Sequence, residues 1–445
     1  MENKYLHKAI VLWTNICRFI LAVVFIFSGF IKANDPLGTV YKVQDYFEAW
    51  NLLELSQGFL PYVVALVMGC LEFVIGSYLL FGIRRRVAPM VSLLLMLFMT
   101  PLTLWLAVEN PISDCGCFGD ALILTNWETF FKNVFLLMAA FSVYKWNQYI
   151  YKFVSNQMDW LVALYSTVFI ILFSVISLNR LPLFDFRPYH LGANIRQKME
   201  IPEGAKLPVY ETILVYEKDG VRKDFTVDNF PEDSTWTFVD SKTILKEKGF
   251  VPEIVDFNLV SQEDGFDLTE DVLTEDYVFL LVSPWLEKAD DSGMDLINEL
   301  YDYCLDYGYR FLCVTASSDD AIMTWQDYTG AEYPFATMDE ITLKTMVRSN
   351  PGLMLLKNGV VIGKWCGSSL PDEYQLTDSL DKLPLGTFTQ LSLWQKIAKI
   401  LAWYFGPLLF FTLADVWWRG KQAGKDPQTE KSETLKKEQK TNKLY

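Results

Sequence analysis

The sequence predicts an α-helical membrane bundle of about six transmembrane helices, joined to an extracytoplasmic α/β domain. Three observations predict this class. The 445-residue chain is 51% hydrophobic, and its apolar residues gather in runs of about 20, the length that crosses a bilayer as a helix. Basic residues cluster beside these runs, as they do on the cytoplasmic side of membrane proteins. Between the last two runs, short apolar strands alternate with amphipathic helices, which is typical of an α/β domain.

Six apolar runs are predicted to span the membrane: 10–31, 60–81, 90–108, 127–144, 160–178 and 391–418. The first four form a predicted membrane domain over residues 1–150, and the fifth belongs to a helical segment over 151–180. A β-rich connector at 181–250 then leads to a thioredoxin-like α/β domain at 251–385. The basic tail, 419–445, holds few apolar residues and is expected to be disordered.

The basic clusters fall at alternate ends of the predicted spans. Three arginines, residues 84–86, follow the second span, Lys145 follows the fourth, and further lysines lie in the tail. The loop before the fourth span has three acidic residues and no basic one. Positive charge marks the cytoplasmic side, so we expect a bacterial inner-membrane protein with both termini in the cytoplasm. The loop and the α/β domain would then lie on the periplasmic side.

The stretch 114–120, which reads Asp-Cys-Gly-Cys-Phe-Gly-Asp, is the candidate catalytic site. Gly116 gives the backbone room to bend the thiols of Cys115 and Cys117 toward each other. A Cys-x-Cys pair can close a small, strained disulfide, and strained disulfides exchange readily. Two interpretations stay open: a redox site, or a tight turn whose cysteines only pack. The two aspartates disfavour a thiolate, so the disulfide is expected to be the resting state, attacked by an incoming thiolate.

Two ionisable residues fall inside predicted spans, where charge is costly and a partner is expected. Glu72 lies about 16 Å into the second span, counted from Pro61 at 1.5 Å a residue. Arg18 reaches a similar depth in the first span when it is counted from Lys32. We therefore expect Arg18 and Glu72 to lie within salt-bridge reach. A structural ion pair and a proton-handling Glu72 both remain open.

Four of the other cysteines are expected to pack as small apolar residues: Cys17, Cys70, Cys304 and Cys313. Cys366 follows a predicted strand and is the one expected to be exposed. Two histidines are too few for a histidine-based metal site, and the sequence has no metal-ligand spacing, phosphate-binding loop or Ser/His/Asp set. The expected partners are the lipid bilayer and a protein thiol or disulfide, and no pattern points to nucleic acid.

Within the α/β region, apolar patterns predict strands at 277–282 and 311–315 and helices at 290–306 and 318–330. Residues 357–359, Lys-Asn-Gly, lie between two apolar runs and predict a β-hairpin.

Two shorter signals complete the pattern. In the connector, residues 211–217 and 223–227 predict a second hairpin with its turn at 218–220. Asp35 and Pro36 are the residues expected at the start of an amphipathic helix, as N-cap and first helical residue.

Several stretches in about the first 145 residues resemble the MauE/DoxX family of four-helix membrane proteins. These are Ser28-Gly-Phe-Ile-Lys32 with Asp35-Pro36, Glu72, and Asp-Cys-Gly-Cys-Phe-Gly from Asp114. MauE-type proteins are implicated in the maturation of methylamine dehydrogenase, an enzyme rich in disulfides. The predicted bundle also resembles that of vitamin K epoxide reductase, which passes thiol electrons to a quinone. The resemblance thus implies a thiol-based function, with a quinone as the cofactor to consider.

Residues 252–383 resemble the thioredoxin-like domains of the TlpA/ResA type. Pro252-Glu-Ile-Val-Asp-Phe-Asn-Leu is similar to their entry strand, and Pro351 stands where that family keeps a cis-proline. The family's Cys-x-x-Cys motif follows the strand that here ends near Val282, but residues 283–289 read Ser-Pro-Trp-Leu-Glu-Lys-Ala. Without a thiolate at that position, this domain is expected to bind or position a partner and not to exchange thiols.

The leading functional hypothesis is an inner-membrane component of a thiol–disulfide redox or protein-maturation pathway. Cys115 and Cys117 would exchange with a periplasmic partner, and electrons would pass to or from a membrane carrier. The rival hypothesis is a non-enzymatic scaffold or assembly factor whose Cys-x-Cys turn is structural. A transporter or oxidase subunit is a third, against which the absence of metal-ligand spacing counts.

Overall fold

The computed structural model describes residues 2–218, 221–226, 229, 231, 235–247, 249–388 and 392–423. The chain divides into two compact units, the first formed by residues 1–186 with 389–445 and the second by 187–388. Most of the predicted connector therefore belongs to the second unit. The turn predicted at 218–220 and the tail predicted at 419–445 fall largely outside the described residues.

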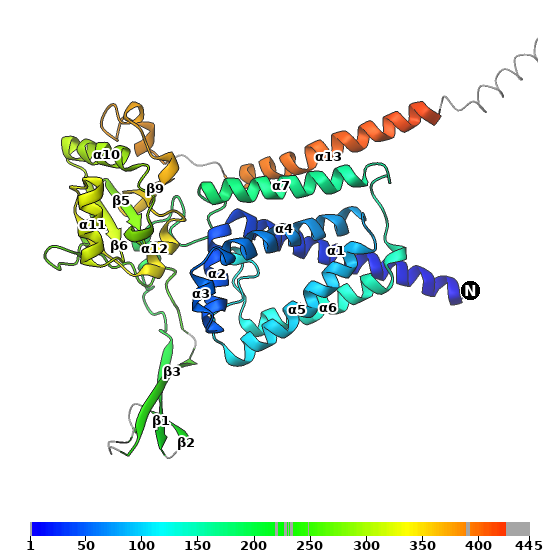
Figure 1. Cartoon of the computed structure of the whole chain (residues 1–445), viewed down its shortest axis with the longest axis horizontal. Coiled ribbons are helices and arrows are strands. Elements are labelled where there is room, and N and C mark those ends of the chain that lie inside the picture. The colour runs from blue at the N-terminus through cyan, green and yellow to red at the C-terminus, as the bar shows by residue number, and fades with distance from the viewer. Residues whose placement is uncertain are drawn as a thin grey trace, which may run out of the picture. The chain divides into compact units, whose positions relative to one another are not determined.

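The first unit consists of helices (Figure 1). Six of them are long: α1 (Glu2–Asn34), α4 (Leu60–Phe81), α5 (Val87–Glu109), α6 (Asn126–Lys145), α7 (Asp159–Asn179) and α13 (Leu393–Ala423). Among the described residues, five helices are long and apolar enough to cross a membrane, namely α1, α4, α5, α7 and α13. Helix α6 occupies the position of the predicted fourth span but is not among those five. Length and composition thus support five of the six predicted spans.

Helices α1 and α4 pack closely because glycines face the neighbouring backbone. A Cβ added at Gly29 would lie 2.4 Å from the backbone nitrogen of Phe73, and one at Gly76 would lie 2.7 Å from that of Ile26. Small residues permit such close approach between membrane helices. Ile26 and Gly29 follow each other in α1, whereas their partners in α4 come in the reverse order, Gly76 and Phe73. Helices α1 and α4 are therefore antiparallel, and these two contacts fix their register.

A buried hydroxyl group connects three helices of the first unit. The hydroxyl of Tyr404 in α13 lies 2.9 Å from the hydroxyls of Ser77 in α4 and Ser166 in α7. Tyr404 is 4% exposed, and buried hydroxyls need such partners. Helix α13, which is far from α4 and α7 in the sequence, is thereby fixed against both.

Helix α2 (Pro36–Ala49) follows α1 after one residue, and the short α3 (Leu53–Ser56) follows α2. The Asp35 side chain accepts a hydrogen bond from the Gly38 backbone at 2.9 Å, and Pro36 is the first helical residue. The predicted helix start is therefore confirmed. This cap turns the chain sharply, so that α2 packs against α4.

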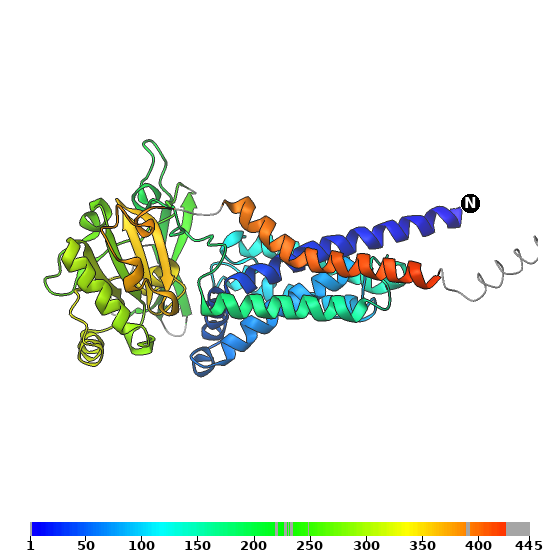
Figure 2. The same ribbon diagram turned by 90° about the horizontal axis from the view of Figure 1, so that it is seen from above.

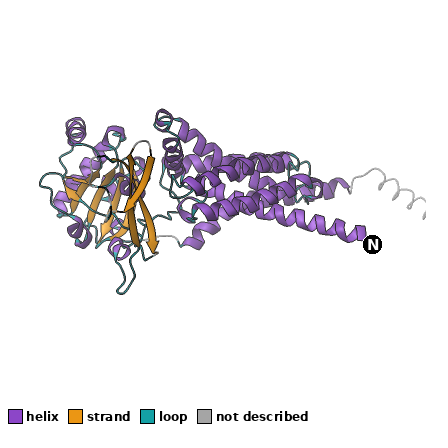
Figure 3. Cartoon of the chain, turned by 90° about the horizontal axis from the view of Figure 1, so that it is seen from below, coloured by secondary structure: helices purple, strands orange, loops and turns teal. Residues whose placement is uncertain are grey.

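In the second unit, a three-stranded antiparallel sheet has the order β2-β1-β3. Its strands are β1 (Val209–Lys218), β2 (Val221–Thr226) and β3 (Thr237–Glu247). The predicted hairpin corresponds to β1 and β2, which pair from Ile213 opposite Thr226 to Lys218 opposite Val221. Every described strand of the chain lies in this second unit, as the colours of Figure 3 make visible.

A six-stranded sheet of order β4-β7-β6-β5-β8-β9 forms the core of the second unit (Figure 2). Its strands are β4 (Val260–Ser261), β5 (Val278–Ser283), β6 (Arg310–Thr315), β7 (Phe335–Thr337), β8 (Gly352–Lys357) and β9 (Val360–Cys366). Strands β5, β6 and β7 are parallel, whereas β8 runs antiparallel to β5 and β9 to β8. The predicted strands and the Lys-Asn-Gly hairpin are confirmed.

Helices α8 (Ile195–Met199), α9 (Thr269–Thr274), α10 (Met294–Tyr307), α11 (Asp319–Thr329) and α12 (Glu340–Met346) complete the second unit. Helix α10 buries Ile297, Leu300 and Cys304 against the sheet. The Asn350–Pro351 peptide bond before β8 is cis, as the sequence predicts. Strand order and the position of this proline together resemble thioredoxin-like folds.

Candidate redox site in the helical unit

The Cys-x-Cys loop connects the end of α5 to the start of α6. Asn110 ends α5 in a left-handed conformation, and the Asn126 side chain donates 2.9 Å hydrogen bonds to the Asn110 side chain and the Ile112 carbonyl. Thr125 and Glu128 cap the start of α6 through a reciprocal pair of hydrogen bonds, which satisfies free backbone donors there. The loop is therefore anchored at both ends.

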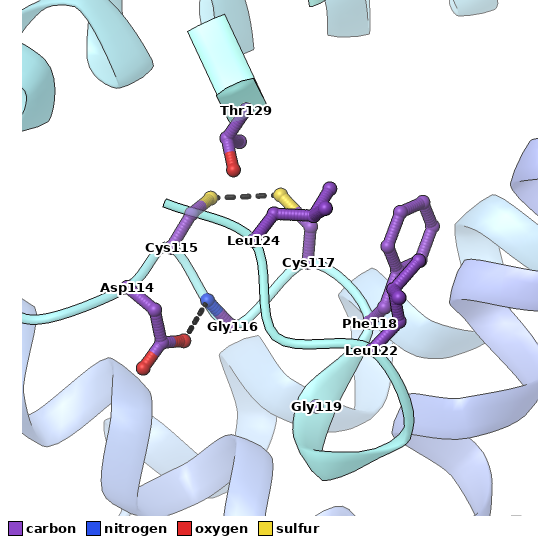
Figure 4. Close-up of a pocket in the computed structure, with 9 residues that line it drawn as sticks. All are labelled: Asp114, Cys115, Gly116, Cys117, Phe118, Gly119, Leu122, Leu124 and Thr129. Carbon is purple, nitrogen blue, oxygen red and sulfur yellow. Dashed lines mark hydrogen bonds between the residues drawn. The ribbon is translucent and has the colours of Figure 1, made fainter. Parts of the chain in front are cut away.

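The sulfurs of Cys115 and Cys117 point toward each other and lie 2.7 Å apart (Figure 4). Gly116 between them has φ +68°, a conformation that residues with a Cβ avoid. A Cβ at Gly116 would also lie 2.6 Å from Cγ of Lys42. The Asp114 carboxylate fixes the bend by accepting the Gly116 backbone N–H at 2.8 Å. The sequence-based expectation that glycine brings the thiols together is confirmed.

A buried cation lies directly behind Cys117. Lys32 Nζ in α1 lies 2.7 Å from Glu72 Oε2, 2.7 Å from Ser28 Oγ and 2.9 Å from the Cys117 carbonyl oxygen. Ser28 Oγ donates to the same carbonyl at 2.6 Å. The side chains of Lys32 and Glu72 are each only 5% exposed. One ammonium group therefore neutralises Glu72 and anchors the thiol loop to α1.

The partner predicted for Glu72 was wrong, because Glu72 pairs with Lys32 and not with Arg18. The antiparallel register of α1 and α4 places Arg18 beside Gly82, where a Cβ would lie 2.8 Å from Arg18 Nη1. Gly82 is ten residues beyond Glu72, about 15 Å along the helix. The prediction failed because it counted the depth of Arg18 from Lys32 and the depth of Glu72 from Pro61, as if Lys32 and Pro61 lay at the same depth in the membrane.

The two thiols have opposite electrostatic environments. The hydrogen bond from Cys115, with the positive charges of Lys132 and Lys32, lowers the pKa of Cys117 to about 6. The same hydrogen bond, together with burial, raises the pKa of Cys115. Cys115 is 6% exposed, whereas Cys117 is half-buried. Cys117 is thus the thiolate of the pair and the less buried of the two residues.

This result corrects the prediction that acidic neighbours suppress the thiolate. Asp114 lies 3.2 Å from Lys42 Nζ, which neutralises it. Lys132 in α6 lies 4.4 Å from the centre of the Phe118 ring, close to the pair. These lysines come from α2 and α6 and not from the loop. The acidic residues of the loop alone therefore did not predict the direction in which the pKa of Cys117 is shifted.

Two pockets adjoin the pair. The smaller, drawn in Figure 4, has a volume of about 10 Å³ and is lined by residues of the loop and by Thr129 of α6. That is about the room of one water molecule. The larger has about 230 Å³ and is lined by both cysteines and by residues of α2, α4 and α5.

The larger pocket is mostly apolar, with polar groups at the thiol end. Its apolar lining includes Val43 and Phe47 of α2 and Met99 of α5, whereas Lys32 and Tyr46 lie beside the cysteines. The Tyr46 hydroxyl donates to the Cys115 carbonyl at 3.2 Å, and burial raises the pKa of this phenol. The phenol therefore stays a hydrogen-bond donor, and the pocket could hold a flat apolar group against the sulfurs.

The remaining cysteines are inside the two units. Cys17, Cys304 and Cys313 are at most 3% exposed, in agreement with the packing role predicted for them, and Cys70 is half-buried. The exposure predicted for Cys366 was wrong, because this residue is 5% exposed. It ends β9 opposite Gly352, inside the sheet.

The second unit has a polar cluster next to its cis-proline. The Ser283 hydroxyl lies 2.7 Å from Asn350 Oδ1, and Asn350 Nδ2 donates to the Trp285 carbonyl at 2.8 Å. Residues 283–289 contain no cysteine. In this segment, the hydrogen bonds of Ser283 and of the Trp285 carbonyl with Asn350 join the end of β5 to the loop that holds the cis-proline. In the described part of the chain, no group of three or more His, Cys, Asp or Glu side chains is placed to hold a metal ion.

Sequence reasoning missed Lys32, Ser28, Lys132 and Tyr46 as parts of the site. A signal for the first two was present, since Ser28 and Lys32 are four residues apart and so share one helix face. Lys132 and Tyr46 carried no such signal, because their proximity to the loop depends on how α6 and α2 pack.

Comparison with known families agrees with the first resemblance. Residues 8–145 match the family described as methylamine utilisation protein MauE, so the helical unit contains a MauE family domain. Residues 210–248, which cover the three-stranded sheet, match a domain of unknown function, DUF8463. A comparison with curated proteins finds no match. The MauE domain and the five apolar helices together describe a multi-pass membrane protein. The DoxX resemblance remains a prediction.

Two solved structures are similar to part of the chain. One is a candidate protein disulfide isomerase from Bacteroides thetaiotaomicron, 13% identical, covering 26% of this chain and 76% of its own, with a TM-score of 0.21. The other is the bacterioferritin comigratory protein of Xanthomonas campestris, studied for alkyl peroxide reduction, 13% identical, covering 26% and 82%, with a TM-score of 0.20. Both TM-scores are far below 0.5, so the thioredoxin-like description here rests on strand order and the proline loop.

Proposed function

We propose that this protein is a membrane thiol–disulfide oxidoreductase whose Cys115 and Cys117 exchange disulfides with a partner protein. The observation that carries the proposal is the arrangement of the pair. The sulfurs lie 2.7 Å apart, and the hydrogen bond from Cys115, with the charges of Lys132 and Lys32, lowers the pKa of Cys117 to about 6 while that of Cys115 is raised. A turn in which the cysteines only pack does not need two thiols whose pKa values are shifted in opposite directions.

The charge arrangement favours a disulfide that accepts electrons. A protein that stabilises the thiolate stabilises the reduced form, and its disulfide is then a stronger oxidant. The hydrogen bond from Cys115 and the positive charges of Lys132 and Lys32 have this effect on Cys117. We infer that the partner supplies thiols and leaves with a disulfide, while the Cys115–Cys117 disulfide is reduced.

The exchange takes two steps. A partner thiolate attacks Sγ of Cys117, the less buried of the two residues, and expels Cys115 as a thiolate, which takes up a proton because its pKa is raised. A second partner thiolate then attacks the partner sulfur of this mixed disulfide and expels Cys117. Cys117 leaves readily because a thiolate of low pKa is a good leaving group. The partner gains one disulfide, and the pair becomes one thiol and one thiolate.

A membrane quinone is the proposed acceptor that restores the disulfide. The Cys115 thiol, the Cys117 thiolate, a quinone and one proton give the disulfide and a quinol, with two electrons passing from the sulfurs to the ring. The 230 Å³ pocket beside the sulfurs supports this step, since an engineered apolar cavity of about 150 Å³ already admits benzene. Its apolar lining suits a ring that arrives from the bilayer.

The proposed location is the bacterial inner membrane, with both termini in the cytoplasm and a periplasmic protein as partner. Residues 84–86, all arginine, and Lys145 support this orientation through the positive-inside bias. The thioredoxin-like unit would dock the partner, because it has the proline loop of that fold but no cysteine in residues 283–289, which directly follow β5.

Trapping the mixed disulfide tests the proposal. In Cys115→Ser the lone Cys117 thiolate can still attack the disulfide of an oxidised partner, which is the reverse reaction, and expel one partner thiolate. No Cys115 remains to displace the partner from Cys117, so the intact protein should accumulate a partner linked to Cys117, visible on non-reducing gels and by mass spectrometry. Cys117→Ser should form no such adduct, and Cys366→Ser, a buried cysteine of the second unit, serves as the control. If no variant traps a protein and Cys115→Ser/Cys117→Ser keeps full activity in cells, the scaffold hypothesis replaces this one.

A further inference from the structure

A second charged site lies about 21 Å along α1 from Lys32, counted over the fourteen residues back to Arg18. Arg18 is 0% exposed. Its Nη1 donates to the Tyr151 carbonyl, but its Nε and Nη2 are buried and have no hydrogen-bond partner. A guanidinium carries five N–H donors, and an unpaired buried charge is strongly destabilising. The described residues therefore leave Nε and Nη2 of Arg18 without a hydrogen-bond acceptor.

Arg85 has the same deficit. Its Nε is also buried without a partner, and its charge acts directly on Arg18. Two guanidinium groups close enough for their charges to interact repel each other unless an anion compensates them. Asp159 at the start of α7 is already paired, because Lys152 Nζ lies 2.7 Å from Asp159 Oδ1.

The surrounding backbone is shaped around Arg18. Gly82 has φ +67°, and a Cβ there would lie 2.1 Å from the Tyr151 carbonyl oxygen. The rings of Phe19 and Phe153 lie 4.5 and 5.3 Å from Arg18 Cζ, and Phe153 is 61% exposed. The guanidinium is thus held between a tight turn and two rings, one of which faces outward.

We propose that Arg18 and Arg85 bind the phosphate group of an anionic membrane lipid. Arg85 lies between the end of α4 at Phe81 and the start of α5 at Val87, and lipid headgroups lie at the ends of spanning helices. The planar arginine fork matches phosphate oxygens, and basic pockets between membrane helices bind such headgroups.

The local surface suits a lipid more than a free ion. Arg85 is half-buried and so links the buried Arg18 to the bilayer surface. Val87 and Phe153 are 50% and 61% exposed and offer apolar contacts to an acyl chain. The site does not depend on thiol chemistry, and it would fix the α4–α5 turn and the 150–153 segment to the membrane.

The test uses the purified full-length protein in neutral detergent, titrated with phosphatidylglycerol, phosphatidylcholine or inorganic phosphate and followed by native mass spectrometry. We expect one phosphatidylglycerol to bind with preference over phosphatidylcholine. Arg85→Met should weaken this binding about tenfold, as expected for loss of a charge-assisted hydrogen bond. The matched control is Arg84→Met, which removes an exposed arginine of the same turn and should leave binding unchanged.

Arg18→Lys is a second variant, because it keeps the buried charge and loses the fork; it should weaken lipid binding while the protein still folds. Three results would overturn the proposal. Inorganic phosphate could compete as well as the lipid, which would indicate a site for a free anion. Phosphatidylcholine could bind equally, or Arg84→Met could weaken binding as much as Arg85→Met, which would indicate unspecific attraction.

Discussion

Lys32 Nζ lies 2.7 Å from Glu72 Oε2, with both side chains 5% exposed, and the same ammonium lies 2.9 Å from the Cys117 carbonyl. The ion pair between α1 and α4 is therefore part of the thiol site. Removing one partner of a buried pair leaves an uncompensated charge, whereas replacing both with apolar residues can be neutral. The contribution of the Lys32–Glu72 pair to the stability of the protein can therefore be measured separately from its contribution to thiol chemistry.

Lys32→Met and Glu72→Met should each destabilise the helical unit by about 3–5 kcal/mol, because each leaves the other charge buried and unpaired. Lys32→Met/Glu72→Met should recover most of that loss. Thermal unfolding of the full-length protein in detergent measures all three. A double variant that loses the sum of the two single losses would show that the charges do not interact.

The pH dependence of Cys117 alkylation should report the charge of Lys132. A positive charge stabilises the thiolate, so in the native protein the rate should rise as pH increases through about 6. Lys132→Met removes that charge, raises the pKa of Cys117 and should slow alkylation at neutral pH. Lys132→Arg should restore the native profile. Peptide mass spectrometry after brief labelling separates Cys117 from the other cysteines.

The control for this profile is Lys145→Met, which removes a lysine from the last turn of the same helix, thirteen residues or about 20 Å from Lys132. An equal shift in Lys145→Met and Lys132→Met would contradict a specific role for Lys132. No shift in either would mean that the hydrogen bond from Cys115 alone sets the reactivity of Cys117.

The sequence predicted the helices, the hairpins and the thiol loop because each depends on local signals. Apolar runs, the Asp35 cap and the Lys-Asn-Gly turn act within a few residues of themselves. The cis geometry before Pro351 was predicted from a family resemblance. These predictions needed no knowledge of how distant segments pack.

The partners of the site were not predictable in the same way. Which residue of α1 meets Glu72 depends on the register of two helices, and contacts at Gly29 and Gly76 set that register. A difference of one helical turn changes the partner. The sign of the charge at Cys117 likewise depends on Lys132, which is fifteen residues away in sequence and comes close only through the packing of α6.

Gly116→Ala should disable the thiol pair. The left-handed backbone at this residue costs a side chain about 1–2 kcal/mol, and the new Cβ would also meet the Lys42 side chain at 2.6 Å. The loop must then move, and oxidation of the purified protein should no longer join Cys115 to Cys117. Gly265→Ala is the matched control, since Gly265 has φ +70° with no atom within 4 Å of the added Cβ. Normal pair formation in Gly116→Ala would contradict this requirement.

Filling the larger pocket should slow reoxidation of the thiol pair by a quinone without changing the reaction of Cys117 with thiol reagents. Val43→Phe adds volume to the apolar lining of this pocket and should slow reoxidation of the reduced protein by a short-chain benzoquinone about tenfold, the effect of about 1.4 kcal/mol of weaker binding. Alkylation of Cys117 should be unchanged. Val67→Phe, at a 56% exposed position of α4, is the control. Equal reoxidation rates in Val43→Phe and the native protein would remove the pocket from the quinone step.

The most direct test of the account is the redox state of Cys115 and Cys117 in growing cells, fixed by acid and read by differential thiol alkylation and mass spectrometry. We predict a disulfide that a pulse of dithiothreitol converts to the dithiol and that returns after the reductant is removed. The buried Cys304 and Cys313, each 0% exposed, should stay reduced throughout and provide the internal reference. A Cys115–Cys117 pair that keeps one state before, during and after the pulse would contradict the account and leave the loop a structural turn.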